Sequence, residues 1–217
     1  MPKSKVRTSS KGYDLYAKDY DATFKHLNSF EKGEILPLLG DIENKQIIDL
    51  GCGTGRLIDQ IKRHLKAENT RFTAVDISEE MLKITKYKFP DVECINADVK
   101  SLPFEDESFD IVVAAFLIVH IRDLTKVFNE IYRILKPNGI LILTNINQRK
   151  APKLKSTNLK SSSPKFNTKE NLIIKSFYHI PAHVIKDLEN SLFTIEKEKF
   201  IKENGIWINQ IIKARKL

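Results

Sequence analysis

The chain has 217 residues, 41% of them hydrophobic and 29% charged, which suits one well-buried α/β core and does not require two domains. No apolar run approaches the roughly 20 residues that a membrane span needs, and residues 1–11 have no apolar stretch behind them, so we expect a cytoplasmic protein without membrane span or signal peptide. Two cysteines, Cys52 and Cys94, support neither a disulfide framework nor a zinc site, and we expect no metal.

The formal net charge of +8 is concentrated in two segments. Residues 1–12 carry four basic side chains and no acid, and residues 144–176 carry eight basic side chains against the single acid Glu170. The rest of the chain is mildly acidic, so the charge does not mark the whole protein as a nucleic-acid binder. We expect residues 1–12 to form a disordered or loosely docked basic tail and residues 13–217 to form a single domain.

Aromatic residues at helical spacing follow this tail. Tyr13, Tyr16, Tyr20 and Phe24 recur three or four positions apart, which predicts an aromatic stripe along one helix face. Ordinary packing is the favoured explanation of such a stripe. A second helix is expected to start with Asn28 as its N-cap, because a glutamate stands three residues later in the capping-box position.

A buried strand that runs into a glycine-rich turn is predicted at residues 47–55. Three glycines at alternate positions allow the backbone to turn tightly and to approach a ligand closely. A helix and a strand at residues 71–75 complete a βαβ unit, and Asp76 then stands where an acid accepts hydrogen bonds from ribose hydroxyls. This arrangement suits a nicotinamide or flavin dinucleotide, or another adenosine-containing cofactor.

The later elements continue to alternate between strands and helices. The apolar run at residues 109–119 suits a central parallel strand that is covered on both faces. A helix is expected over residues 124–135, a strand over residues 139–144, and a terminal hairpin with its turn at Asn204-Gly205. Such short links imply a doubly wound, mostly parallel sheet that finishes with an antiparallel pair.

Residues 145–176 interrupt this alternation. Their lysines and serines follow no helical or strand period. A loop of this length in a compact domain is usually a functional lid or a disordered insertion, and both interpretations stay open.

Spacing separates the candidate cofactors. The dinucleotide fingerprint requires glycine or alanine at the position of Arg56. The sequence Asp-Leu-Gly-Cys-Gly-Thr-Gly at residues 49–55 instead resembles motif I of the class I S-adenosylmethionine-dependent methyltransferases, and residues 74–78 and 96–99 resemble the ribose-binding and adenine-binding segments of that family. The resemblance covers roughly residues 13–144, and the terminal hairpin fits the family's reversed seventh strand.

Within this family, the chain is similar to the small-molecule enzymes of ubiquinone and menaquinone biosynthesis, the type 11 group. The similarity lies in the Tyr-Asp pairs at residues 13–14 and 20–21 and in His120. The resemblance implies an α/β fold with a doubly wound seven-stranded sheet of order 3-2-1-4-5-7-6. Strand 7 is antiparallel in that fold, and N-terminal helices cap the cofactor site.

The resemblance also implies S-adenosylmethionine as the cofactor and S-adenosylhomocysteine as its product. The glycine turn is expected to lie against the methionine portion with Asp49 near its ammonium group, while Asp76 accepts from the ribose hydroxyls and Asp98 from the adenine amino group. The cofactor-binding residues that it assigns are Asp49, Gly51, Cys52, Gly53, Gly55, Asp76, Ile77, Met81, Asp98, Val99 and Ala115.

Methyl transfer from a sulfonium is an in-line displacement, so the main task of the protein is to align the acceptor with the methyl carbon. Alignment accounts for about 7 to 11 kcal/mol of barrier, and a base matters only for a protonated acceptor. His120 is the first candidate for a base or an orienting residue, followed by Tyr20, Tyr178 and His179, and ordinary packing is an equal alternative for each. We expect Tyr20 and His120 to line the acceptor pocket.

Two absences narrow the choice of acceptor. Ala-Ala-Phe-Leu at residues 114–117 replaces the Asn/Asp-Pro-Pro-Tyr/Phe pattern of enzymes that methylate exocyclic base nitrogens, and no Pro-Cys pair supplies a nucleophile for cytosine C5. We therefore rank a small acidic or quinone-like metabolite first, with the basic loop as its lid or as a solvated segment. A tRNA or rRNA acceptor ranks second and a protein side chain third. A cofactor-binding protein without catalysis stays an alternative, and the oligomeric state is left open.

Overall fold

The computed structural model describes residues 5–147, 149, 165–167 and 171–217. Its main sheet has seven strands in the order β4-β3-β2-β5-β6-β10-β9. Neighbouring strands from β4 to β6 are parallel, and β10 is antiparallel to both β6 and β9. Numbered within this sheet, the order is 3-2-1-4-5-7-6, so the predicted fold is confirmed. The strands are β2 (Gln46–Leu50), β3 (Arg71–Asp76), β4 (Glu93–Asn96), β5 (Phe109–Ala114), β6 (Leu135–Ile146), β9 (Phe193–Glu203) and β10 (Ile206–Lys216).

The predicted terminal hairpin is present between β9 and β10. Asn204 and Gly205 form its two-residue loop and have φ angles of 50° and 76°. Positive φ at both central residues is the geometry of the type I′ turn, which matches the twist of the strands on either side. This turn allows the last strand to return along β6 in the reverse direction.

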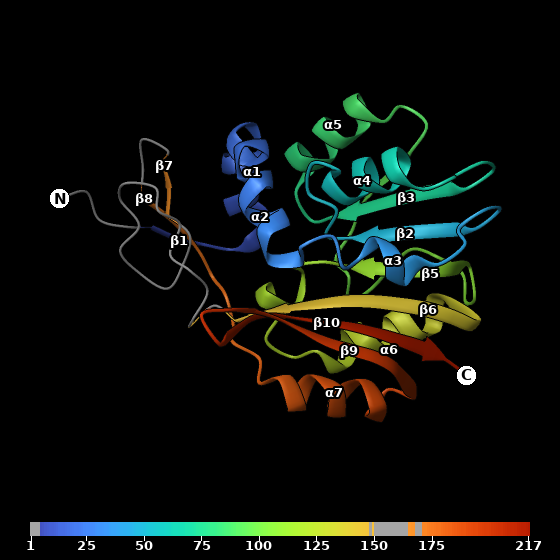
Figure 1. Ribbon diagram of the computed structural model, residues 1–217. Coiled ribbons are helices and arrows are strands. Elements are labelled where there is room, and N and C mark those ends of the chain that lie inside the picture. Colours follow the sequence, from blue (N-terminus) through green and yellow to red (C-terminus); the bar gives the residue numbers. More distant parts are fainter. Residues whose placement is uncertain (1–4, 148, 150–164, 168–170) are drawn as a thin grey trace.

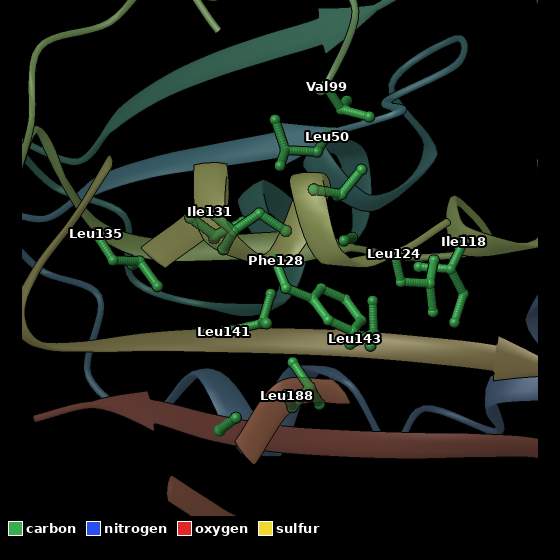
Figure 2. Close-up of a cluster of buried hydrophobic side chains, with 14 of the residues drawn as sticks. Leu50, Val99, Ile118, Leu124, Phe128, Ile131, Leu135, Leu141, Leu143 and Leu188 are labelled. Carbon is green, nitrogen blue, oxygen red and sulfur yellow. The ribbon is translucent and has the colours of Figure 1, made fainter. Parts of the chain in front are cut away.

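Helices cover both faces of the main sheet. One face packs on α3 (Leu36–Leu39), α4 (Arg56–His64) and α5 (Glu79–Lys88). The other face packs on α6 (Thr125–Ile134) and α7 (Pro181–Asn190). Figure 2 shows this second cluster, in which Phe128 and Ile131 of α6 lie against Leu50 and Leu141 of the sheet. Successive residues of a strand point to opposite faces, so an uninterrupted apolar strand fills both clusters.

The parallel strands β2, β3 and β5 point toward one edge of the sheet, where the N-terminal helices lie (Figure 1). These are α1 (Ser9–Tyr20), the 3-10 turn η1 (Asp21–Thr23) and α2 (Phe24–Glu31). Ligands of open α/β sheets bind outside the carboxyl ends of the strands. The N-terminal helices are therefore placed to cover such a ligand.

The expectation of a disordered or loosely docked tail over residues 1–12 is wrong for residues 5–12. Lys5–Arg7 form β1 in a second sheet of order β1-β8-β7, and α1 begins at Ser9. The strand β1 pairs in parallel with β8 (Asn171–Ile174), a partner from the far end of the chain that no local pattern reveals. Gly12 of α1 is buried and packs closely against β8. An added Cβ at this position would lie only 2.6 Å from Ile174 Cγ1.

The segment at residues 145–176 contains more strand than its composition predicts. The strand β6 runs to Ile146, and β7 (Lys165–Asn167) pairs with β8. The remaining lysine-rich part of the predicted basic loop lies mostly outside the described residues.

Two further expectations are wrong: the N-cap role of Asn28 and the single strand over residues 109–119. Asn28 lies inside α2 and is not an N-cap, because its side chain accepts hydrogen bonds from Arg56 and Gln60 of α4 instead. The apolar run at residues 109–119 is not one strand. The strand ends at Ala114, and the 3-10 turn η2 (Ile118–His120) follows, so the second half of the run lines the edge of the sheet.

Candidate functional site

A cavity of about 450 Å³ lies at the carboxyl edge of the sheet, beneath α1. This volume is in the range of small-molecule sites, about 300 to 1,000 Å³. Asp49, Cys52 and Gly55 are buried beside the cavity and do not line it. The predicted residues that line it are Tyr20, Gly51, Gly53, Asp76, Ile77, Met81, Asp98, Val99, Ala115 and His120.

The glycine turn brings bare backbone to the cavity wall. Gly51 and Gly53 have φ angles of 71° and 55°, a region that L side chains rarely adopt. An added Cβ at Gly51 would lie 3.0 Å from Leu117 Cδ1, and one at Gly53 would lie 3.2 Å from Tyr20 Cε1. The backbone N–H groups of Gly51 and Cys52 donate to Val75 O at 2.8 and 3.0 Å, which holds the turn against β3.

Asp76 ends β3 directly beside this turn. Its Oδ2 accepts from Gly53 N–H at 2.8 Å, and its Oδ1 accepts from Ser78 N–H at 2.9 Å. Burial raises the pKa of Asp76, while the hydrogen bonds from Ser78 and Gly53 oppose that rise. Each carboxylate oxygen can accept more than one hydrogen bond, so Asp76 is fixed in place and still able to bind hydroxyl groups.

Asp49 lies near the end of β2, behind the turn. Burial raises the pKa of Asp49 to about 7, and the guanidinium of Arg56 opposes that rise. A cation placed beside a carboxyl group favours its charged form. Asp49 is therefore chemically suited to the ammonium partner that the family resemblance gives it.

The residues that the resemblance assigns to the adenine ring differ in exposure. Met81 and Val99 are buried, whereas 40% of Ile77 is exposed. Asp98 is also exposed, and its carboxylate is already engaged, since Lys100 N–H donates to Oδ1 at 3.0 Å and Lys100 Nζ lies 3.2 Å from Oδ2. An apolar sandwich is thus available to a ring, while Asp98 offers a weaker polar contact than Asp76.

The cavity also has a wall from the N-terminal helix that the sequence assignment missed. Thr8, Ser9, Ser10 and Tyr13 line it from α1 and its first residues. The hydroxyl residues just before the aromatic stripe are an N-cap signal that would have placed the helix start correctly. Phe116 lines the cavity beside Ala115, and Ala97 lines it from the segment that resembles the family's adenine-binding segment. The other lining residues, which no pattern indicated, are Lys100, Leu117 and Ile121.

Tyr13 and His120 meet within this wall. Tyr13 Oη lies 2.7 Å from His120 Nε2. Burial lowers the pKa of His120 to about 4, and burial together with Tyr20 and Asp76 raises the pKa of Tyr13. Both side chains are therefore neutral at pH 7. Tyr20 lies next to them, with its ring centroid 6.0 Å from that of Tyr13, so the structure brings both predicted acceptor-pocket residues together.

Hydrogen bonds fix α1 and η1 over the glycine turn and the start of α5. Asp14 Oδ1 accepts from Ser78 Oγ at 2.6 Å and from Glu80 N–H at 3.4 Å. Asp21 Oδ1 accepts from Thr54 Oγ at 2.6 Å, and Asp21 also pairs with Lys88. The first helix is thus latched to the glycine turn and to α5.

A buried ion pair joins α2 to the first residue of α4. Arg56 Nη1 and Nη2 donate to Glu31 Oε2 and Oε1 at 2.6 and 2.7 Å. The guanidinium carbon also lies 5.2 Å from the centre of the Phe116 ring. Arg56 stands where the dinucleotide-binding fingerprint requires glycine or alanine. Because of these contacts it also has a structural role, which its position in the sequence did not indicate.

The secondary candidates Tyr178 and His179 are not brought to the cavity. His179 Nε2 lies 3.0 Å from Ile118 O and 2.9 Å from Ile121 O, so it holds the η2 turn. The Tyr178 ring packs beside Trp207, with ring centroids 6.3 Å apart.

Within the described part of the chain, no group of three or more His, Cys, Asp or Glu side chains could hold a metal ion. None of the helices described is long and apolar enough to cross a bilayer.

Comparisons with known proteins agree with the fold. Residues 48–143 match the family described as "Methyltransferase domain". The chain is 33% identical over 162 residues to an uncharacterised methyltransferase of Schizosaccharomyces pombe, covering 74% of this chain and 62% of that protein. It is 30% identical over 138 residues to the demethylmenaquinone methyltransferase of Thermotoga maritima, covering 62% of this chain and 59% of that protein. The chain thus spans about three fifths of the length of these two relatives.

Solved structures share the architecture. An S-adenosylmethionine-dependent methyltransferase from Mesorhizobium loti aligns with a TM-score of 0.68 at 17% identity, over 86% of this chain and 98% of that chain. The fold, the glycine turn with Asp76 and the family match define a class I S-adenosylmethionine-dependent methyltransferase domain. Residues 48–143 belong to the type 11 methyltransferase domain family, and the cofactor of this class is S-adenosylmethionine.

Proposed function

We propose that this protein transfers a methyl group from S-adenosylmethionine to a small acceptor held beneath α1. The observation that carries the proposal is the cavity, because it joins the glycine turn and Asp76 on one side to a polar and aromatic wall from α1 on the other. The cofactor supplies a methyl group that is already activated on a sulfonium. The residues of the chain bind, align and exclude water.

The cofactor contacts in this proposal follow from the geometry. Asp76 binds the ribose hydroxyls with the lone pairs that Gly53 and Ser78 leave free. Met81 and Val99 contact the adenine ring from buried positions. The bare backbone at Gly51 and Gly53 lies against the methionine portion, where a Cβ would fill the available space.

A small acceptor is favoured by the position of α1. A macromolecular acceptor needs an open approach to the methyl group, whereas Asp14 and Asp21 hold α1 and η1 over the cavity. The aromatic rings of Tyr13, Tyr20 and Phe116 suit a planar, quinone-like metabolite. The name of the Thermotoga relative, demethylmenaquinone methyltransferase, supports the same class of acceptor. No observation on the described residues favours an RNA or protein acceptor.

Two measurements test this proposal. Calorimetric titration with S-adenosylmethionine and S-adenosylhomocysteine tests the cofactor site, and we expect binding by the native chain that is lost in Asp76→Ala. Incubation with methyl-labelled S-adenosylmethionine and separated small-molecule, RNA and protein fractions of a cell extract tests the acceptor. We expect label in the small-molecule fraction. Label confined to RNA or protein contradicts the proposed acceptor, and binding without label in any fraction favours a cofactor-binding protein.

A further inference from the structure

Tyr13 and His120 lie more than a hundred positions apart in the sequence and form one hydrogen-bonded pair in the cavity wall. Tyr13 comes from α1 and His120 from the end of η2, and their ring centroids lie 5.2 Å apart at an interplanar angle of 87°. Both residues line the cavity. The pair therefore faces whatever acceptor the cavity holds.

The second ring nitrogen of His120 sets the direction of this hydrogen bond. His120 Nδ1 lies 3.3 Å from the carbonyl oxygen of Lys175, and a carbonyl oxygen only accepts, so Nδ1 carries the hydrogen. A neutral imidazole has one N–H group, so Nε2 accepts and the Tyr13 hydroxyl donates. The oxygen of Tyr13 keeps its own lone pairs for a further hydrogen bond.

We propose that Tyr13 and His120 act as a proton-accepting pair for an acceptor that is methylated on a hydroxyl oxygen, an inference that rests on the function proposed above. In this step the acceptor oxygen forms a bond to the methyl carbon, and the carbon–sulfur bond breaks with its electron pair left on sulfur. The acceptor proton moves to the Tyr13 oxygen while the Tyr13 proton moves to His120 Nε2. The imidazolium that results keeps its Nδ1–H on Lys175 O and later releases a proton to water.

Because both members of the pair are neutral at rest, the pair suits an acceptor that is methylated on oxygen and not one that is methylated on nitrogen. A hydroxyl oxygen becomes strongly acidic as it gains a carbon, so even an imidazole whose pKa burial lowers to about 4 can take its proton. A methylated amine holds its proton about as firmly as lysine, with a pKa of about 10, and does not yield it to such an imidazole. Burial raises the pKa of Tyr13, and Tyr20, Asp76 and Tyr16 raise it further, which keeps the phenol protonated until His120 receives the proton.

The resting pair is tested without any acceptor by ¹⁵N NMR of the histidine side chains in the full chain. We expect the Nδ1–H tautomer for His120 at pH 7, and in Tyr13→Phe we expect the Nε2 resonance to move toward its unbonded value. Tyr132→Phe is the matched control, since Tyr132 of α6 packs against Phe193 and does not line the cavity. A hydrogen on Nε2, or an Nε2 resonance that does not change in Tyr13→Phe, would show that the proposed hydrogen bond does not form.

The transfer step is tested with ¹³C-methyl S-adenosylmethionine and the small-molecule fraction of a cell extract. We expect the labelled product carbon to show the chemical shift of a methoxy group. Tyr13→Phe and His120→Gln are each expected to lower kcat about a hundredfold with KM for the cofactor within about twofold, and Tyr132→Phe to leave both unchanged.

The two variants separate proton transfer from positioning. In His120→Gln the introduced amide oxygen still accepts a hydrogen bond from the Tyr13 hydroxyl but takes no proton, so normal turnover in that variant, or label on nitrogen or carbon, overturns the proposal. If the native chain binds the cofactor and labels no product, the proposed function fails, while the NMR measurement still decides whether the pair exists.

Discussion

The cavity is lined by the glycine turn and Asp76 and also by α1. In Figure 1, α1 lies beyond the ends of β2 and β3. We call residues 46–78 the floor and residues 5–31 the lid. Backbone hydrogen bonds between neighbouring strands hold the floor, as in the N–H groups of Gly51 and Cys52 that donate to Val75 O. Apart from the strand pairing of β1 with β8, the lid is held largely by single side-chain contacts, such as Asp14 with Ser78 and Tyr13 with His120.

This difference separates the affinity for the cofactor, which depends on the floor, from the access of ligands to the cavity, which depends on the lid. A backbone ladder forms or melts as a unit, so the floor keeps its shape whether or not the lid is in place. A lid fixed by a few side chains opens when those contacts break, and opening is needed for the cofactor to enter and the product to leave. We therefore expect substitutions in the floor to change cofactor affinity and substitutions in the lid to change its motion.

The largest effect is expected where the floor and lid join, at Glu31 and Arg56. Glu31→Gln leaves the Arg56 guanidinium buried without a charged partner, and the two side chains are only 3% and 7% exposed. Removing one partner of a buried ion pair costs about 3 to 5 kcal/mol. Chemical denaturation should show a loss of this size in the free energy of unfolding.

The double variant Glu31→Leu with Arg56→Met is the control for this prediction. It removes both charges and leaves apolar side chains of similar volume, so we expect most of the lost stability to return. A double variant as unstable as Glu31→Gln would show that the ion pair is not the cause.

The same comparison explains which parts of the molecule could be predicted from sequence. The floor is encoded locally, because an apolar strand, alternate glycines and Asp76 stand close together in the chain. The lid depends on β1 pairing with Leu172 and Ile174, and on His120 meeting Tyr13. Contacts between such distant residues leave no period in the sequence, so the stripe at Tyr13 and Tyr20 predicted a helix without its partners.

Asp76→Ala should have the next largest effect, on affinity. A hydrogen bond to a charged group contributes about 1.5 to 3 kcal/mol, so losing the ribose contacts should weaken S-adenosylmethionine binding by at least about a hundredfold in calorimetric titration. Asp98→Ala is the control within the same cavity. Asp98 is exposed and paired with Lys100, so we expect at most about a tenfold loss, and equal losses in the two variants would contradict the geometry.

We expect the pH dependence of cofactor binding to come from Asp49 in the floor and from no residue of the lid. The family resemblance implies that the ammonium group of the cofactor lies near Asp49. Burial raises the pKa of Asp49 to about 7, and an ammonium group placed there favours the carboxylate, so we expect binding below that pH to release a proton. We expect affinity to rise about tenfold per pH unit from about pH 5.5 to pH 7 and then to level off. Tyr13 and His120 stay neutral over this range, because burial raises the pKa of the first and lowers that of the second to about 4.

Two controls accompany the pH series. Asp49→Asn should bind with an affinity that no longer changes over this range, and a slope that persists in this variant assigns the proton to another group. In the protein without cofactor, stability changes with pH in the direction opposite to that of cofactor affinity. The raised pKa of Asp49 means that folding favours its protonated form, so the stability of the free native chain should fall as the pH rises from about 4 to about 7.

The smallest effect is expected for Asp14→Asn, in the latch of the lid. This change weakens the hydrogen bonds that Asp14 Oδ1 accepts from Ser78 Oγ and Glu80 N–H, at 2.6 and 3.4 Å. Because the latch is one of several contacts, we expect amide hydrogens of α1 to exchange about tenfold faster, which corresponds to about 1.4 kcal/mol of local opening free energy. Exchange in β2 and β3 should stay unchanged, as should α1 exchange in the exposed control Asp19→Asn. Faster exchange in β2 together with α1 would mean that the lid and floor open as one unit, and the separation of affinity from access would then be wrong.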